Sequence, residues 1–446
     1  MVRKFPRSNP TDRVSNDDLM SLASERGATP MQVGAVLMLD AREGLDHGLV
    51  VDAIASRVTV VPRLRQRLVK VPWGCGRPVW VDDRDFNIAN HVSSVRCPAP
   101  GGESAVLGIA AELLGIRLTR DRPLWTARLV TDTGQGGAAL IVVFHHVLAD
   151  GVGGLAVLAA LVDGAAEGHD LAFPVPMPPL PQLAIEAATE HLRSAGQLPA
   201  VLRRLRGGAA QLRPVFSRGL ARSSLNQPTG LRRRFTIVRV DLDQIRSAAK
   251  AGQATVNDVV LTAIAAALHR LLASRGEPID QFVISVPYSA RRHATADELG
   301  NQSGVIPLRV PGVGDPLQRL RSLAETTRAT KRAQRGASTA LLGPFFRLLA
   351  AAGLYSWFID RQRLIHTFVS NLRGPEIRLS FLRCPVTGVI PLTGAGGNIT
   401  VSFAVLSYAG TLAITLIADP DTCPDLSELR DGLEQELRVL TASTRQ

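Results

Sequence analysis

The stretch FHHVLADGVGG, from Phe144 to Gly154, joins an apolar run to a glycine-rich segment. The run that leads into it, residues 138–144, has the length and composition of a buried strand, and a helix is predicted from Gly154 to Ala165. Between them, a short turn with Asp150 can bring a carboxylate close to the two histidines. An imidazole that faces a pocket there could act as a general base, with nearby groups holding its tautomer. A purely structural contact between histidine and aspartate is the alternative.

Strand and helix patterns alternate on both sides of this stretch. The predicted strands lie at residues 33–39, 125–130, 138–144, 235–240, 282–286, 366–370, 399–405 and 411–417. The other predicted helices lie at residues 49–57, 256–273 and 426–440. Mixed strand and helix order in both halves predicts an α/β (α+β) fold with mixed sheets.

The composition is that of a globular protein with room for a large core. The chain has 446 residues, which predicts two to three domains. Apolar residues make up 46% of it and aromatic residues only 4%, so the core must consist mostly of alanine, valine and leucine. The four cysteines are far apart and form no CxxC pair, which predicts neither a zinc site nor a disulfide framework. No apolar stretch follows the basic N-terminus, so we expect no secretory signal and a cytoplasmic protein.

The positive charge is carried almost entirely by arginine. The net charge is +12, and only four of the 51 basic residues are lysine. Nucleic acid, an anionic membrane and a phosphorylated small molecule such as coenzyme A are candidate partners, and a merely solvated basic surface is the alternative. Residues 191–240 contain eleven arginines and no acidic residue, after a proline-rich stretch. This predicts a basic helical linker at 191–225 between an N-terminal unit, 1–190, and a C-terminal unit, 226–446.

One apolar segment, Thr339–Ile359, is long enough to span a membrane. Pro344 and Arg347 lie inside it, and a charge at the centre of a bilayer is costly. A buried helix is therefore one interpretation, and an apolar helix that lies in a membrane interface is the other.

The HHxxxDG pattern resembles that of coenzyme A-dependent acyltransferases and peptide-synthetase condensation domains. Further segments in the same order along the chain resemble the bacterial wax ester synthase/diacylglycerol acyltransferase family. They are TPMQVGAVLML (29–39), VPRLRQRLV (61–69), RPVWVDDRDFNIANHV (77–92), RPLWTARLV (122–130), TVNDVVLTAIAAAL (255–268), ELGNQSGVIPLRVP (298–311) and VSNLRGP (369–375). Two segments depart from the family pattern: residues 14–28 lack an aromatic residue, and Leu372 and Arg373 stand where smaller or apolar residues are usual.

The resemblance implies two chloramphenicol-acetyltransferase-like lobes, at 1–190 and 226–446, with an active-site tunnel at their interface. It implies transfer of a long-chain acyl group from acyl-CoA to diacylglycerol, giving triacylglycerol, with long-chain alcohols as a second acceptor class, giving wax esters. Acyl-CoA would be a substrate, and no cofactor or metal is expected. His146 would deprotonate the acceptor hydroxyl, which attacks the thioester directly, without an acyl-enzyme.

The resemblance also assigns the other site residues. His145 and Asp150 belong to the catalytic motif, with Asp150 more structural than proton-carrying. Asn257 would hydrogen-bond the developing oxyanion, and a helix N-cap is its alternative role. The expected substrate-binding or structural residues are Gly151, Pro123, Leu124, Trp125, Asp258, Gly300, Asn301, Ser370 and Asn371.

Two other functions fit the same sequence less well. One is an acyltransferase for another acceptor, of the condensation or polyketide-associated type. The other is a non-catalytic lipid-binding or membrane-coating protein. The sequence has no GxSxG elbow, Walker A motif or complete dinucleotide fingerprint, which argues against a serine hydrolase, a nucleotide hydrolase and a dehydrogenase. We expect peripheral association with the inner membrane or lipid inclusions, and no nucleic-acid partner.

Overall fold

The structure is a computed structural model. It describes residues 11–15, 18–19, 21–22, 25, 30–42, 44–165, 173–193, 220, 223–289, 299, 303–334, 349, 352–394 and 396–442. The predicted linker at 191–225 lies mostly outside these residues, as do Gly300, Asn301 and most of the apolar segment Thr339–Ile359.

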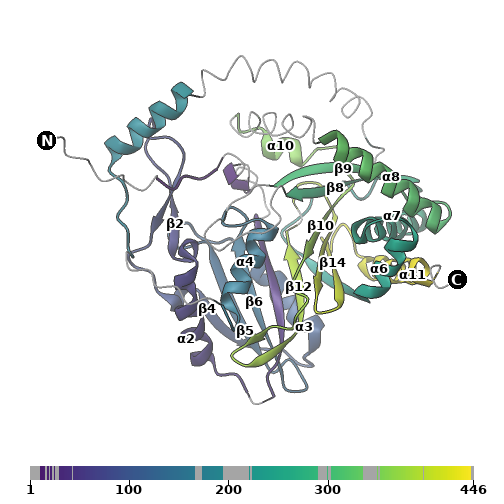
Figure 1. The fold of residues 1–446 in the computed structure, drawn as a ribbon, viewed down its shortest axis with the longest axis horizontal. Helices are drawn as coiled ribbons and strands as arrows, with labels where there is room; N and C mark the ends of the chain where they lie inside the picture. Colours follow the sequence, from purple (N-terminus) through teal and green to yellow (C-terminus); the bar gives the residue numbers. More distant parts are fainter. Residues whose placement is uncertain are drawn as a thin grey trace.

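The first of two large sheets has six strands in the order β11-β12-β1-β6-β5-β4. Its strands are β1 (Gln32–Asp40), β4 (Val92–Arg96), β5 (Trp125–Thr131), β6 (Gly137–His145), β11 (Ser380–Phe381) and β12 (Cys384–Thr393). Helices α2 (His47–Arg57) and α4 (Gly151–Leu161) share a core with one face, and α3 (Gly102–Gly115) with the other (Figure 1). A small separate sheet pairs β2 (Gln66–Val69) with β3 (Val79–Asp82).

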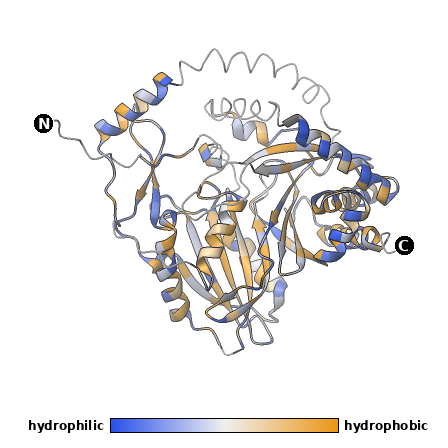
Figure 2. Cartoon of the chain, viewed as in Figure 1, coloured by the Kyte–Doolittle hydropathy of each residue, from blue (hydrophilic) through white to orange (hydrophobic). Residues whose placement is uncertain are grey.

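The central strand β6 is apolar along its length because both of its faces are covered. Leu140, Val142 and Phe144 pack with α2 and α4, whereas Ile141 and Val143 pack with α3 and with strands of the second sheet. Figure 2 shows the hydrophobic colouring concentrated on β6 and α4. A strand buried on both faces has a fixed position, and this fixes the two histidines at its end.

Gly34 allows β1 to lie against β6. A Cβ atom at this position would lie 2.1 Å from the carbonyl oxygen of Val142, which is backbone and cannot move aside. The predicted strand at 33–39 is therefore confirmed, and its single glycine is a steric requirement of the pairing.

The second sheet also has six strands, in the order β7-β14-β13-β10-β8-β9. Its strands are β7 (Arg234–Asp241), β8 (Gln281–Ser289), β9 (Ser303–Pro311), β10 (Thr367–Arg373), β13 (Val401–Tyr408) and β14 (Thr411–Ala418). Its helices are α6 (Leu242–Ala251), α7 (Val256–Ser274), α8 (Pro316–Gln334), α10 (Tyr355–Ile359) and α11 (Leu426–Ala442). β10 runs parallel to both β8 and β13, so the sheet is mixed as predicted.

The helix α7 is the centre of the second core. It is the one described helix that is long and apolar enough to cross a membrane, but 72% of its apolar window is buried inside the protein. Alanine-rich sequence lets it pack closely against α11 and α8, consistent with a core poor in aromatic residues.

The C-terminal half of the chain contributes two strands to the first sheet. β11 and β12 follow β10 in the chain, yet β12 pairs with β1 in the first sheet over Val33–Leu39. The predicted C-terminal range, 226–446, therefore contains two strands of the other sheet. Asp163, just after α4, holds the turn between these strands: its carboxylate accepts hydrogen bonds from the backbone N–H groups of Leu382 (3.0 Å) and Arg383 (2.8 Å).

Candidate active site

The HHVLADG stretch forms a tight turn between β6 and α4. His145 is the last residue of β6, and its carbonyl accepts a hydrogen bond from Leu148 N–H (2.9 Å). His146 N–H donates to the carbonyl of Met31, next to β1 (2.8 Å). The helix begins at Gly151, three residues earlier than predicted, because Asp150 is its N-cap and accepts from Gly153 N–H (2.9 Å).

Both ring nitrogens of His145 lie against protein groups. Its Nδ1 accepts a hydrogen bond from Val147 N–H at 2.9 Å, and its Nε2 lies 3.2 Å from Oε1 of Glu25. The side chain is fully buried. An imidazole held in this way cannot also take a proton from a substrate.

Glu25 is a site residue that the motifs did not reveal. Its side chain is only 4% exposed, and Arg120 donates to its Oε2 at 2.7 Å. Burial alone would raise the pKa of Glu25, but its contacts with His145 and with the charged Arg120 outweigh burial and lower it. The sequence offers one weak signal for it. An acidic residue lies in segment 14–28, which departs from the family pattern, and arginines that could pair with it lie just before the PLW motif.

His146 differs from its neighbour. Part of its surface is accessible, and burial of the rest lowers the pKa of its imidazole. The charges of Asp150 and Asp18 act in the opposite direction and are weaker than burial. The net lowering keeps the His146 ring neutral near pH 7, the form that can accept a proton.

The PLW segment forms a wall beside the histidines. Pro123, Leu124 and Trp125 are all buried, and the carbonyl of Leu124 accepts a hydrogen bond from His145 N–H at 2.9 Å. Trp125 donates from its indole to the carbonyl of Leu64 at 2.7 Å. These contacts hold the end of β6 in place.

The asparagine of the ND segment, in α7, contacts the asparagine of the SNLRGP segment, in β10 of the second sheet. Asn371 Nδ2 donates to Asn257 Oδ1 at 3.1 Å. The alternative role of Asn257 as a helix N-cap is wrong, because Thr255 caps α7. Asp258 completes a capping box with Thr255, since each side chain binds the other's backbone N–H (3.2 and 2.9 Å).

A cavity of about 620 Å³ contains the asparagine pair. Its lining also includes Leu372 of β10, whose side chain reaches the first residue of α4: a Cβ atom on Gly151 would lie 2.8 Å from Leu372 Cδ2. Leu372 thus connects the cavity with the HHVLADG turn. Ser370 lies on the same strand, partly buried, beside Ala404 of β13. Gly300 and Asn301 lie outside the described residues, although Leu299 is near Gly153.

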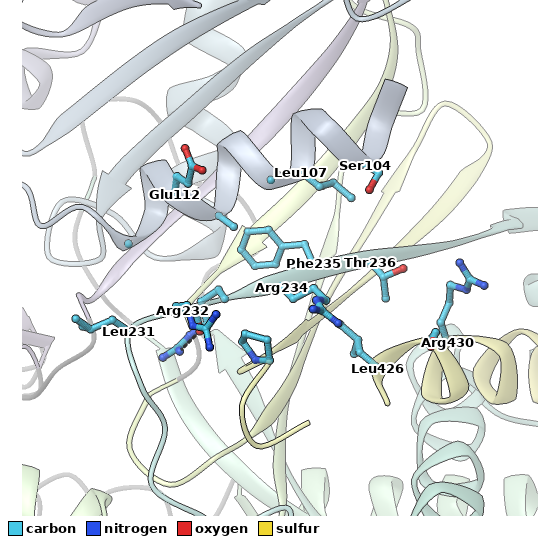
Figure 3. Close-up of a pocket in the computed structure, with 16 residues that line it drawn as sticks. Ser104, Leu107, Glu112, Leu231, Arg232, Arg234, Phe235, Thr236, Leu426 and Arg430 are labelled. Atoms are coloured by element: carbon cyan, nitrogen blue, oxygen red, sulfur yellow. Dashed lines mark hydrogen bonds between the residues drawn. The ribbon is translucent and has the colours of Figure 1, made fainter. Parts of the chain in front are cut away.

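A second cavity, of about 680 Å³, lies between α3, the start of β7 and the start of α11 (Figure 3). Four arginines contribute to its lining: Arg232, Arg233, Arg234 and Arg430. Arg232 pairs with Asp421, and Arg430 pairs with Asp431 at 2.6 Å. This cavity is on the α3 side of the first sheet, whereas the HHVLADG turn leads into α4 on the other side. It is therefore not part of the candidate site. Within the described ranges, no group of three histidine, cysteine, aspartate or glutamate side chains could hold a metal ion.

Comparison with protein families decides the identity of the chain. The model described as the wax ester synthase/diacylglycerol acyltransferase catalytic domain matches residues 14–260, and the model of the WS/DGAT C-terminal domain matches residues 299–441. The chain belongs to this family. The resemblance inferred from the motifs is confirmed, and the WS/DGAT family is one of acyltransferase enzymes.

Individual relatives agree with membership in the WS/DGAT family. A Mycobacterium tuberculosis protein named probable diacylglycerol O-acyltransferase is 28% identical over 429 residues, covering 92% of this chain and 91% of that protein. The wax ester synthase/diacylglycerol acyltransferase from Marinobacter aquaeolei VT8 has a TM-score of 0.71 at 24% identity, covering 97% of this chain and all of that one. A starter condensation domain of rhizomide synthetase, in complex with C8-CoA and Leu-SNAC, has a TM-score of 0.64 at 16% identity over 98% and 95% of the two chains. The predicted two-lobed fold is confirmed.

Proposed function

We propose that this protein transfers a long-chain acyl group from acyl-CoA to the hydroxyl of diacylglycerol, with His146 as general base. One observation carries the assignment of the base: protein groups lie against both ring nitrogens of His145, while His146 is partly accessible and has a lowered pKa. The neighbouring histidines therefore have different tasks, one in holding the turn and the other in chemistry.

The reaction follows from a neutral imidazole placed beside the acceptor. His146 takes the proton of the acceptor hydroxyl while the hydroxyl oxygen attacks the thioester carbonyl. The carbon–sulfur bond then breaks, and the proton passes from His146 to the leaving coenzyme A thiolate. The products are an ester and free coenzyme A, with no covalent enzyme intermediate.

The asparagine pair is suited to stabilise the charge that develops on the carbonyl oxygen. Because Asn371 donates to Asn257 Oδ1, the Asn257 amide is oriented and its Nδ2 group remains as a donor. A donor fixed in advance stabilises an oxyanion most effectively. We assign this role to Asn257 and the role of holding it to Asn371.

The cavity around the pair has the chemistry expected for acyl-CoA. Much of its lining is apolar, and its basic lining residues are Arg246, Lys331 and Arg373, which suit phosphate groups. The starter condensation domain described with C8-CoA bound shows that a relative of this fold takes an acyl-CoA. We therefore place the donor substrate in this cavity.

The decisive test is product formation by the purified protein. Acyl-CoA would be supplied with diacylglycerol or with a long-chain alcohol, and triacylglycerol or wax ester would be measured separately. Triacylglycerol formation supports the proposal, and wax ester alone would reassign the acceptor. If no product forms with either acceptor, two alternatives remain: an enzyme for another acceptor, or a non-catalytic lipid-binding protein.

The role of His146 is tested by comparing two variants. His146→Ala should lose about 10²- to 10⁴-fold in rate, the usual contribution of a general base. His145→Ala should fold but be impaired, because the turn loses its anchor. Full activity of His146→Ala would refute the mechanism, and equal loss in two folded variants would refute the division of roles.

We further propose that the enzyme works at the surface of the inner membrane or of lipid inclusions, facing the cytoplasm. The water-insoluble products, the net charge of +12 and exposed side chains such as Trp357 (59%) support this. Flotation with anionic liposomes at low and high salt tests it, because salt screens electrostatic attachment but not apolar insertion. Protein that stays soluble at low salt with excess liposomes would refute it.

A further inference from the structure

The buried contact between Glu25 and His145 is unusual for a structural ion pair. A carboxylate with 4% exposure must be compensated, because desolvation of a charge is costly. Arg120 supplies one partner at 2.7 Å, and Arg117 donates to the backbone carbonyl of Glu25, also at 2.7 Å. Both arginines are half-exposed, whereas the remaining partner, His145, is fully buried. The carboxylate is therefore anchored on the solvent side and directed inward at one imidazole.

The hydrogen bonds of His145 determine its tautomer. Val147 N–H can only donate, so the Nδ1 that receives it carries no hydrogen. The ring proton must then lie on Nε2, the nitrogen that lies 3.2 Å from Oε1 of Glu25. In the other tautomer, Nδ1–H would face the N–H group of Val147, and an unprotonated Nε2 would face the Glu25 carboxylate.

The ring of His145 also holds the turn that carries His146. Val147 follows His146 directly, so its hydrogen bond to the ring fixes the peptide between them. Leu148 N–H binds the carbonyl of His145 and closes the same turn. His146 N–H reaches outside the turn and donates to the carbonyl of Met31. Orientation of the His146 side chain therefore depends on the ring of His145.

From these contacts we infer that Glu25, anchored by Arg120 and Arg117, is a positioning residue that fixes the tautomer and ring plane of His145 and thereby places His146 for proton transfer. The inference rests on the proposed role of His146 as base. Glu25 touches no reacting atom in this scheme, and it acts through His145 alone.

The charges around the histidines allow this role to be separated from a direct electrostatic one. The groups that act most on His146 are Asp150, His145 and Asp18. Around His145 the charged groups are Glu25, Arg120 and Arg117. Loss of the Glu25 charge should therefore lower the maximal rate and leave the acid limb of the pH–rate profile in place.

Glu25→Gln is the sharpest variant, because it keeps the shape of the side chain. Arg120 can only donate, so the amide oxygen turns to Arg120 and the amide NH₂ faces Nε2 of His145. That arrangement favours the other tautomer and opposes the bond from Val147 N–H. Nitrogen NMR of histidine-labelled protein, with the His145 signal identified by its loss in His145→Gln, should show one Nε2–H tautomer in the wild type and a changed tautomer in Glu25→Gln.

Kinetics in a double-mutant cycle give the second measurement. Glu25→Gln should lower kcat by about 10- to 100-fold, the usual effect of removing a carboxylate that orients a histidine, with little change in KM. In a His145→Gln background the same substitution should have no further effect, since Glu25 acts through His145. Equal losses in both backgrounds would overturn the inference, as would unchanged kcat in folded Glu25→Gln.

Glu436→Gln is the matched control. Glu436 is equally buried and binds two arginines, Arg319 at 3.0 Å and Arg270 at 2.8 Å, in the core of the second sheet. The Glu436→Gln variant should lose thermal stability, but the tautomer of His145 and kcat should not change. If Glu25→Gln does not fold, Arg120→Gln replaces it and should change the same two readouts to a smaller extent, and no change would overturn the inference. If the wild type has no transferase activity, the proposed function fails, and the nitrogen spectrum alone decides whether Glu25 fixes His145.

Discussion

Asp163 offers a direct test of how the two sheets are held together. Its carboxylate binds the two backbone N–H groups of the turn between β11 and β12, and Arg57 donates to it at 2.5 Å. Leu382 and Arg383 have φ angles of +49° and +65°, a conformation that non-glycine residues rarely adopt. The turn therefore depends on its hydrogen bonds to Asp163, and Asp163→Asn should loosen it.

The expected magnitude follows from the contacts that are lost. Asn can accept at one of the two N–H groups but cannot provide the charge. Hydrogen bonds to charged groups contribute about 1.5 to 3 kcal/mol each, and the Asp163 side chain is 25% exposed, which screens the ion pair with Arg57. We expect the free energy of opening of β11 and β12 to fall by about 2 to 3 kcal/mol. This corresponds to amide exchange about 30- to 150-fold faster in β12.

Hydrogen exchange measured by peptide mass spectrometry checks this, with β6 as an internal reference that should change less. Asp421→Asn removes an ion pair to Arg232 in which both side chains are more than half exposed, so exchange should change less than about twofold. Unchanged protection of Cys384–Thr393 in Asp163→Asn would refute the proposed fastening. Uniformly faster exchange across the whole chain would also refute it, since the effect should be local.

Three further predictions concern a strand, a buried histidine and the helix cap. Gly34→Ala should lower the free energy of unfolding by more than about 3 kcal/mol or prevent folding, because its Cβ would meet the Val142 carbonyl. On the neighbouring strand, a Cβ at Gly388 would meet nothing within 4 Å, so Gly388→Ala should unfold at the same denaturant midpoint as the wild type. Burial lowers the pKa of His366 to about 4, so stability present above pH 6.5 should be lost as the pH falls towards 4, by up to about 3 kcal/mol; His366→Gln should flatten this dependence in pH-dependent urea unfolding, and an unchanged slope would contradict it. Asp150→Asn keeps an acceptor for Gly153 N–H but removes a charge that raises the pKa of His146, so the acid limb of the kcat profile should move to lower pH; a shift to higher pH would contradict the geometry.

The sequence predicts elements well where a single pattern decides them. Apolar runs at 138–144, 399–405 and 411–417 predicted strands that the structure confirms as β6, β13 and β14. The predicted start of α4, Gly154, is three residues late, because the cap at Asp150 fixes the helix start at Gly151. A cap is decided by one hydrogen bond, and composition does not show it.

Non-local features could not be predicted in the same way. β12 contains two prolines and a glycine and pairs with a strand more than 300 residues earlier, so no local pattern marks it. The histidine motif is visible in the sequence, but the different roles proposed for His145 and His146 rest on what lies against each ring. Glu25 was missed for the same reason, since its partner lies 120 positions away along the chain.

The place of β12 has a consequence for how the polypeptide is made. β6 is complete when residue 145 has been translated, but β1 does not gain its outer neighbour until residue 393 has left the ribosome. At about 5 to 20 residues per second, the interval is roughly 12 to 50 s. During that time β1 would present an open, apolar strand edge, a site prone to aggregation. Nascent chains should therefore bind chaperones until β12 has been synthesised, and truncation before residue 393 should give insoluble protein.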